Sequence, residues 1–115
     1  MAQGDRRADR TVTLDIAGRL DELRRRIDEL DADIVRSLNV RAECAKEIGH
    51  LKNTVGMDTY QPTRERAVLE HVRGVNGGPL AGEAVTRVFE RIIDESRRLE
   101  RITSIEDDED GDEVE

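Results

Sequence analysis

Apolar residues recur at steps of three and four positions through the first half of the chain. Between Asp15 and Asn53 they occupy positions Leu20, Leu23, Ile27, Leu30, Ile34, Leu38, Ala42, Ala45, Ile48 and Leu51. Steps of this kind place side chains on one stripe of an α-helix. The pattern therefore predicts one long helix from about Leu14 to Thr54, which would be about 60 Å long at about 1.5 Å per residue.

Two shorter helices are predicted after it. Pro62 suits the first turn of a helix, so the second helix should begin at residues 61–63 and end where residues 74–79, GVNGGP, break the pattern. The third should begin at residues 81–83 and continue to about Ile102. Two short helices cannot cover the whole apolar stripe of the long one, whereas a second copy of the chain can. The predicted fold class is all-α, one long helix plus two shorter helices, with a core completed by association.

Composition agrees with one helical domain. Charged residues make up 40% of the 115 residues and aromatic residues 2%, which would give a monomer a thin core. The net charge of −8 is concentrated at the end, because residues 106–115, EDDEDGDEVE, contain eight acids and no base. Such a run cannot bury apolar surface. We expect a flexible arm at residues 1–13, a helical domain at 14–103 and a disordered acidic tail at 104–115.

Several classes of site and location are disfavoured. Cys44 is the only cysteine, which offers no disulfide framework and fits a reducing compartment. The sequence lacks both the apolar segment of a secretory signal and an apolar run of membrane-spanning length, so we expect a cytoplasmic protein with no membrane partner. His50 and His71 do not have metal-ligand spacing. We therefore expect no metal and no cofactor, and the acidic balance disfavours nucleic acid.

Basic residues beside the apolar stripe are the first candidates for a binding site. Arg41 and Lys52 are 11 residues apart, which leaves them only about 20° apart around the helix axis. A cation in this position needs an anion, supplied either by a carboxylate such as Asp28, Asp31 or Glu47 or by a small polyanionic ligand. Arg24 would lie about 42 Å from Lys52 along the helix. If both serve one pocket, Arg24 must come from a second, antiparallel copy.

The shorter helices add companion residues. Arg64 and Glu65 lie at the start of the second helix, where the positive end of the helix dipole also favours an anion. Ser96 and Glu100 are four residues apart and share one face of the third helix. Each of these features alone is weak evidence for a binding site. Their combination, in this order on three helices, is much more specific.

Three segments carry a resemblance to a known family. They are LRRRIDELDADIVRSLNVRAECAKEIGHLK, YQPTRERAVLEHV and VFERIIDESRRLE. Together, over about residues 20–101, they resemble a chorismate mutase of the all-helical class, in its small bacterial, monofunctional or pathway-regulatory form. The resemblance implies an intertwined helical-bundle homodimer. Each of its pockets would be lined mainly by one chain and completed by an arginine from the first helix of the other.

The resemblance also implies an activity and residue roles. The activity is the Claisen rearrangement of chorismate to prephenate in phenylalanine and tyrosine biosynthesis, which needs no cofactor. The transition state would be stabilised by electrostatics and by holding one conformer. Arg41, with Arg24 of the partner subunit, would bind carboxylates, and Lys52 would contact a carboxylate and the ether oxygen. The remaining implied substrate contacts are support from Arg64, the hydroxyl contact of Glu65 and carboxylate binding by Ser96.

Two positions depart from the family pattern. Gln61 stands where many members have Asp, so altered contacts with the substrate hydroxyl are expected. Glu100 stands where bacterial members often have Gln as a second donor to the ether oxygen. An ionised carboxylate would repel the negative charge that develops there, so Glu100 must be protonated to help. We therefore predict activity that declines as pH rises.

Two other functions are consistent with the same residues. One is an isochorismate-pyruvate lyase, which shares the helical plan and the basic pocket. The other is a non-catalytic module that binds chorismate or prephenate and regulates the first enzyme of aromatic biosynthesis. The resemblance implies an association with that enzyme for a mutase as well. The sequence RER at residues 64–66 favours the mutase.

Overall fold

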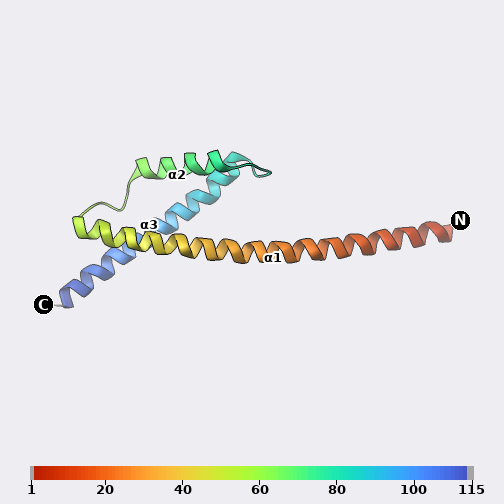
Figure 1. Ribbon diagram of the computed structural model, residues 1–115, viewed down its shortest axis with the longest axis horizontal. Helices are drawn as coiled ribbons and strands as arrows, with labels where there is room; N and C mark the ends of the chain where they lie inside the picture. The colour runs from red at the N-terminus through yellow and green to blue at the C-terminus, as the bar shows by residue number, and fades with distance from the viewer. Residues whose placement is uncertain (1, 114–115) are drawn as a thin grey trace. The chain divides into compact units, whose positions relative to one another are not determined.

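The computed structural model describes the backbone of residues 2–113 and the side chains of residues 9–109. Over these residues the chain forms three helices and no strand: α1 is Ala2–Val55, α2 is Pro62–Val75 and α3 is Gly82–Glu113 (Figure 1). The predicted all-α fold is confirmed. The chain divides into two compact units, residues 1–39 and residues 40–115, and the division lies within α1.

The first unit is a helix whose apolar stripe is exposed. Every described side chain from residue 9 to residue 39 is exposed. Three ion pairs at i,i+3 spacing lie on its surface. Pairs of this kind stabilise a helix by only about 0.2–0.5 kcal/mol each. Six residues of the stripe are between 37% and 55% exposed, namely Leu20, Leu23, Ile27, Leu30, Ile34 and Leu38. A stripe of this length is typical of a surface that binds another protein.

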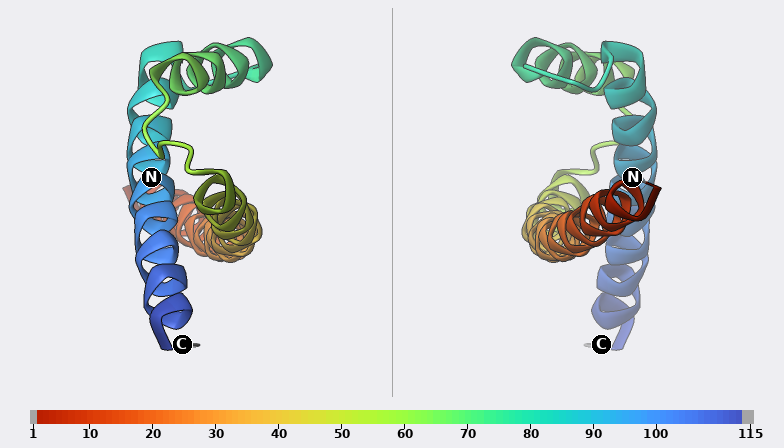
Figure 2. Two further views of the ribbon diagram at one scale, coloured as in Figure 1. Left: turned by 90° about the vertical axis from the view of Figure 1, so that its left-hand side faces the viewer. Right: turned by 90° about the vertical axis from the view of Figure 1, so that its right-hand side faces the viewer.

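The second unit contains the end of α1 together with α2 and α3, and Figure 2 shows the short turn that joins α2 to α3. Its buried apolar residues are Ala45 of α1, Val72 of α2 and Ile93 of α3, so each helix contributes one. Val75 of α2 and Val88 of α3 are exposed. One chain therefore buries only a small core.

Local backbone contacts explain where the helices meet the loops. Gly56 has φ 68°, and the hydrogen bonds from Gly56 N to Asn53 O (3.3 Å) and from Met57 N to Lys52 O (2.8 Å) form a Schellman motif that ends α1. Pro62 occupies the first turn of α2, as predicted. In the turn before α3, the Asn76 side chain accepts from Gly78 N (3.2 Å) and donates to Leu80 O (2.8 Å).

Two helix ends differ from the prediction. α1 begins at Ala2 and not at Leu14, and α3 continues to Glu113 beyond the expected end at Ile102. Polar contacts with α1 explain the longer α3: Ser104 donates to Asn53 (3.0 Å), and His50 pairs with Asp107 (2.6 Å). The division into an arm at 1–13, a domain at 14–103 and a tail at 104–115 stays a prediction. Residues 1, 114 and 115, and the side chains of 1–8 and 110–115, lie outside the described part.

Within the described residues, no helix combines the length and the apolar character that crossing a membrane requires.

α1 and α3 approach each other closely at Gly49. A Cβ atom added there would lie 3.1 Å from both the Cα and the carbonyl oxygen of Glu100, which belong to the backbone of α3. Helix backbone cannot yield as a flexible side chain can. Because Gly49 has no side chain, the two helices can lie this close together. The short separation brings polar side chains of α1 and α3 within hydrogen-bond distance of each other.

We predict that Gly49→Ala destabilises the protein by about 1–3 kcal/mol, the range typical of overpacking. The matched control is Gly74→Ala in α2, where an added Cβ meets nothing within 4 Å. That control should be neutral or stabilising by up to about 1 kcal/mol, because alanine favours helix. Urea unfolding followed by circular dichroism measures both. Equal effects of the two substitutions would contradict the tight approach.

Candidate functional site

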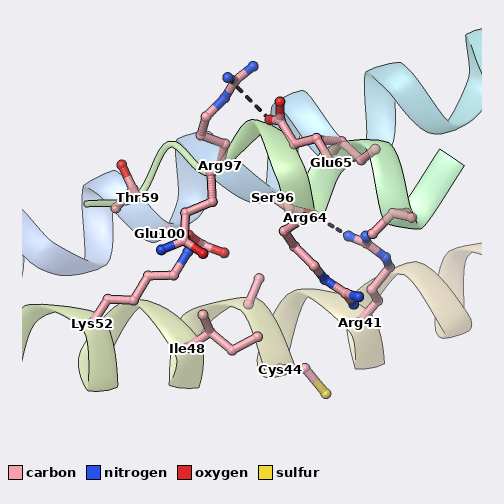
Figure 3. Close-up of a pocket in the computed structure, with 14 residues that line it drawn as sticks. Arg41, Cys44, Ile48, Lys52, Thr59, Arg64, Glu65, Ser96, Arg97 and Glu100 are labelled. Carbon is pink, nitrogen blue, oxygen red and sulfur yellow. Dashed lines mark hydrogen bonds and ion pairs between the residues drawn. The ribbon is translucent and has the colours of Figure 1, made fainter. Parts of the chain in front are cut away.

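A pocket of about 350 Å³ lies within the second unit, where the end of α1, the loop before α2, the start of α2 and the middle of α3 come together (Figure 3). Its lining residues are Arg41, Cys44, Ala45, Ile48, Lys52, Thr59, Gln61, Arg64, Glu65, Val68, Ile93, Ser96, Arg97 and Glu100.

Seven of the eight residues singled out from the sequence line this pocket. They come from three helices and a loop, and they are Arg41, Lys52, Gln61, Arg64, Glu65, Ser96 and Glu100. The eighth, Arg24, is an exposed residue of the first unit and is not among the lining residues. The structure thus assembles in one place a set of residues separated by up to 59 positions in the sequence.

Arg41 is held by a neutral partner. Its Nη1 donates a hydrogen bond to the hydroxyl of Ser96, and that hydroxyl donates to the carbonyl oxygen of Ile92 (2.9 Å). Ser96 therefore fixes the guanidinium group without neutralising it. Among the described residues Arg41 has no ion pair, so none of the carboxylates that the sequence offered as partners, such as Asp28 or Glu47, takes that place.

Lys52 and Glu100 form the least exposed ion pair of the site. Lys52 Nζ lies 3.0 Å from Glu100 Oε2, and the two side chains are 15% and 12% exposed. Lys52 lies on α1, one turn after Gly49, and Glu100 is the residue of α3 that Gly49 approaches. An ammonium group has three donor hydrogens. Lys52 can therefore hold Glu100 and still donate to a ligand in the pocket.

Arg64 is the second cation without a carboxylate. It lies in the first turn of α2, and Figure 3 shows its side chain extending toward α1 beside Arg41. The described residues include no ion pair of Arg64. Two neighbouring guanidinium groups repel each other unless an anion lies between them. The pair is therefore suited to a ligand that carries negative charge.

Arg97 also lines the pocket, although the sequence pattern did not predict it. Its Nη1 lies 3.2 Å from Glu65 Oε1, so the guanidinium group neutralises the one carboxylate that α2 contributes to the pocket. Arg97 directly follows Ser96 in a run of charged residues, and nothing in the spacing of these residues identifies Arg97 as part of a binding site. Only the folded chain reveals that it faces α2.

The charges of the lining residues show which ligands suit the pocket. Four side chains are basic and two are acidic, and each acid is paired: Glu100 with Lys52 and Glu65 with Arg97. The two arginines without ion pairs leave an excess of two positive charges in a chain whose net charge is −8. Guanidinium groups bind carboxylates through charge-assisted, often bidentate hydrogen bonds. A small molecule with two carboxylates matches this excess.

In the part of the chain that the structure describes, no group of three or more His, Cys, Asp or Glu side chains is arranged to hold a metal ion.

Comparisons with known proteins agree with this geometry. The sequence matches the family described as chorismate mutase type II over residues 23–101. It is similar to the bifunctional chorismate mutase/prephenate dehydratase of Neisseria gonorrhoeae, with 43% identity over 90 residues, which are 75% of this chain and 24% of that protein. It is also similar to the chorismate mutase of Methanocaldococcus jannaschii, with 26% identity over 72% of this chain and 85% of that protein.

A solved structure is similar as well. It is the Form II structure of a chorismate mutase from Thermus thermophilus, which matches 72% of this chain and 94% of its own with a TM-score of 0.71 and 32% sequence identity. The chain spans about a quarter of the length of the bifunctional relatives.

Proposed function

This chain belongs to the type II chorismate mutase family, and we propose that it converts chorismate to prephenate. The observation that carries the proposal is the excess of two positive charges in the pocket, contributed by Arg41 and Arg64. Chorismate has two carboxylates. A pocket that holds both of them can fix the compact conformer in which the rearrangement occurs.

The reaction is an intramolecular Claisen rearrangement. The ether C–O bond breaks while a C–C bond forms within the same molecule, so no group is transferred to the protein. The protein must hold the reactive conformer and stabilise the negative charge that develops on the ether oxygen, because only interactions stronger in the transition state raise the rate. Lys52 suits that oxygen, since it keeps donors free while it pairs with Glu100. Gln61 and Glu65 would contact the substrate hydroxyl, and Ser96 would bind a substrate carboxylate.

The complete pocket requires a second copy of the chain. The exposed apolar stripe of the first unit supports this part of the proposal, because leucine and isoleucine side chains on a long helix gain stability when they are buried. In an intertwined, antiparallel homodimer, Arg24 of the partner subunit would reach the pocket that Arg41 and Lys52 line. The cytoplasm fits the lone Cys44, which is exposed.

We predict that the purified chain forms prephenate from chorismate and that Arg41→Ala lowers kcat/KM at least about a hundredfold, since it removes a charged donor from the pocket. Arg91→Ala is the matched control. Arg91 is exposed on α3, pairs with Glu95 at 2.8 Å and lies outside the pocket, so its loss should change little. Chorismate consumption and prephenate formation are followed together.

The same assay separates the rival functions. Pyruvate release from isochorismate without prephenate formation from chorismate would identify a lyase. Binding of chorismate with turnover of neither substrate would identify a regulatory module, such as a partner of the first enzyme of aromatic biosynthesis. Either result would contradict the proposed mutase.

We predict that two inactive variants restore activity when they are unfolded and refolded together. In a heterodimer of Arg24→Ala and Arg41→Ala chains, one pocket keeps both arginines and the other lacks both. Random pairing would then return about a quarter of the wild-type activity. Each variant refolded alone is the control. Recovery of no activity would show that Arg24 does not act across subunits.

A further inference from the structure

Arg97 joins three parts of the pocket wall. Its two terminal nitrogens approach two carboxylates, Nη1 to Glu65 of α2 (3.2 Å) and Nη2 to Asp94 of α3 (2.7 Å). Its guanidinium carbon lies 5.2 Å from the ring centre of Tyr60, in the loop before α2. The side chains of Arg97 and Glu65 are 28% and 26% exposed, so this ion pair is partly shielded from water.

The three contacts use different features of one planar group. The edges of a guanidinium donate hydrogen bonds, and its face stacks on an aromatic ring. A lysine at this position would offer a single point charge and could not meet both carboxylates and the ring together. The arrangement is therefore specific to arginine.

Tyr60, the loop residue that Arg97 contacts, lies in a segment with few hydrogen bonds to the rest of the chain. In the described part of the chain, residues 58–60 make no hydrogen bond, while the loop ends are fixed by Met57 N to Lys52 O (2.8 Å) and by Glu65 N to Gln61 O (3.2 Å). Thr59 and Gln61, on either side of Tyr60, both line the pocket. The contact between Tyr60 and Arg97 thus secures the middle of a loop that forms part of the pocket wall.

Figure 3 shows the carboxylate of Glu65 turned toward Arg97 and away from Lys52. Without Arg97 this carboxylate would stand unpaired at the wall of a pocket that, under the proposed function, receives a dianion. It would repel the substrate and would no longer be fixed in place.

We propose that Arg97 is a positioning residue: it holds the Glu65 carboxylate in place and clamps the loop at Tyr60 against α3, and so maintains the part of the pocket that contacts the substrate hydroxyl. This inference rests on the proposed function. The substrate hydroxyl keeps both of its bonds while the ether C–O bond breaks, so Arg97 supports substrate binding more than the chemical step. Loss of such binding raises KM and leaves kcat nearly unchanged.

The first test is kinetic. Arg97→Ala should raise KM for chorismate about tenfold while kcat changes less than about threefold, as expected when a uniform binding interaction is lost. Arg91→Ala, an exposed arginine on the same helix, should leave both constants unchanged. In a Glu65→Gln background Arg97→Ala should raise KM by a much smaller factor, because no carboxylate remains to be held. An undiminished effect there would show that Arg97 does not act through Glu65 and would overturn that part of the proposal.

The second test needs no substrate. Tyr60 is the only tyrosine and the chain has no tryptophan, so intrinsic fluorescence reports on this ring alone. Arg97→Ala should lower the fluorescence anisotropy of Tyr60, and Arg91→Ala should not. Unchanged anisotropy in Arg97→Ala would overturn the clamp. A wild-type protein that converts no chorismate would refute the proposed function, whereas the anisotropy would still decide the contact.

Arg97→Lys guards against a variant that does not fold. It keeps the charge and most of the stem but loses the planar group, so KM should rise to a value between those of the wild type and Arg97→Ala. A lysine variant with the KM and the anisotropy of the wild type would show that the fork and the face of the guanidinium are not needed.

Discussion

The tight approach of α1 to α3 at Gly49 is the constraint on which the site depends. The backbone of Glu100 lies 3.1 Å from the point where a side chain at position 49 would begin, and this closeness brings Lys52 within 3.0 Å of Glu100. The hydrogen bond from Arg41 to Ser96 spans the same two helices farther along. A wider separation would leave each of these cations facing water, where an ion pair contributes little.

Charge distribution follows from that geometry. The chain as a whole is acidic, yet its pocket collects four basic side chains and pairs only two of them with carboxylates. Arg41 is fixed by a hydroxyl, which orients its charge without neutralising it. The site is therefore arranged in advance for an anion, and little reorganisation is needed when one binds. Such preorganisation suits a reaction in which the protein supplies position and electrostatic stabilisation.

Much of this could be predicted from the sequence, for definable reasons. Helical periodicity fixes which residues share a face, and Pro62 and Gly56 mark helix ends, so the three helices and seven pocket residues were anticipated. The ends of α1 and α3 were not, because helix continuation past Ile102 depends on contacts such as His50 with Asp107. Arg97 was missed because its importance arises from residues on two other elements. Arg24 does not line the pocket of the single chain, and its role across subunits stays a proposal.

The most direct measurement is a crystal structure of the protein with a stable dicarboxylate analogue of chorismate that cannot rearrange. We expect one analogue in each pocket of a dimer, with its carboxylates bound by Arg41, Arg64 and Arg24 of the partner subunit. Its ether oxygen should lie beside Lys52. An analogue bound elsewhere, or a pocket filled in a single chain without a contribution from a second, would contradict this expectation.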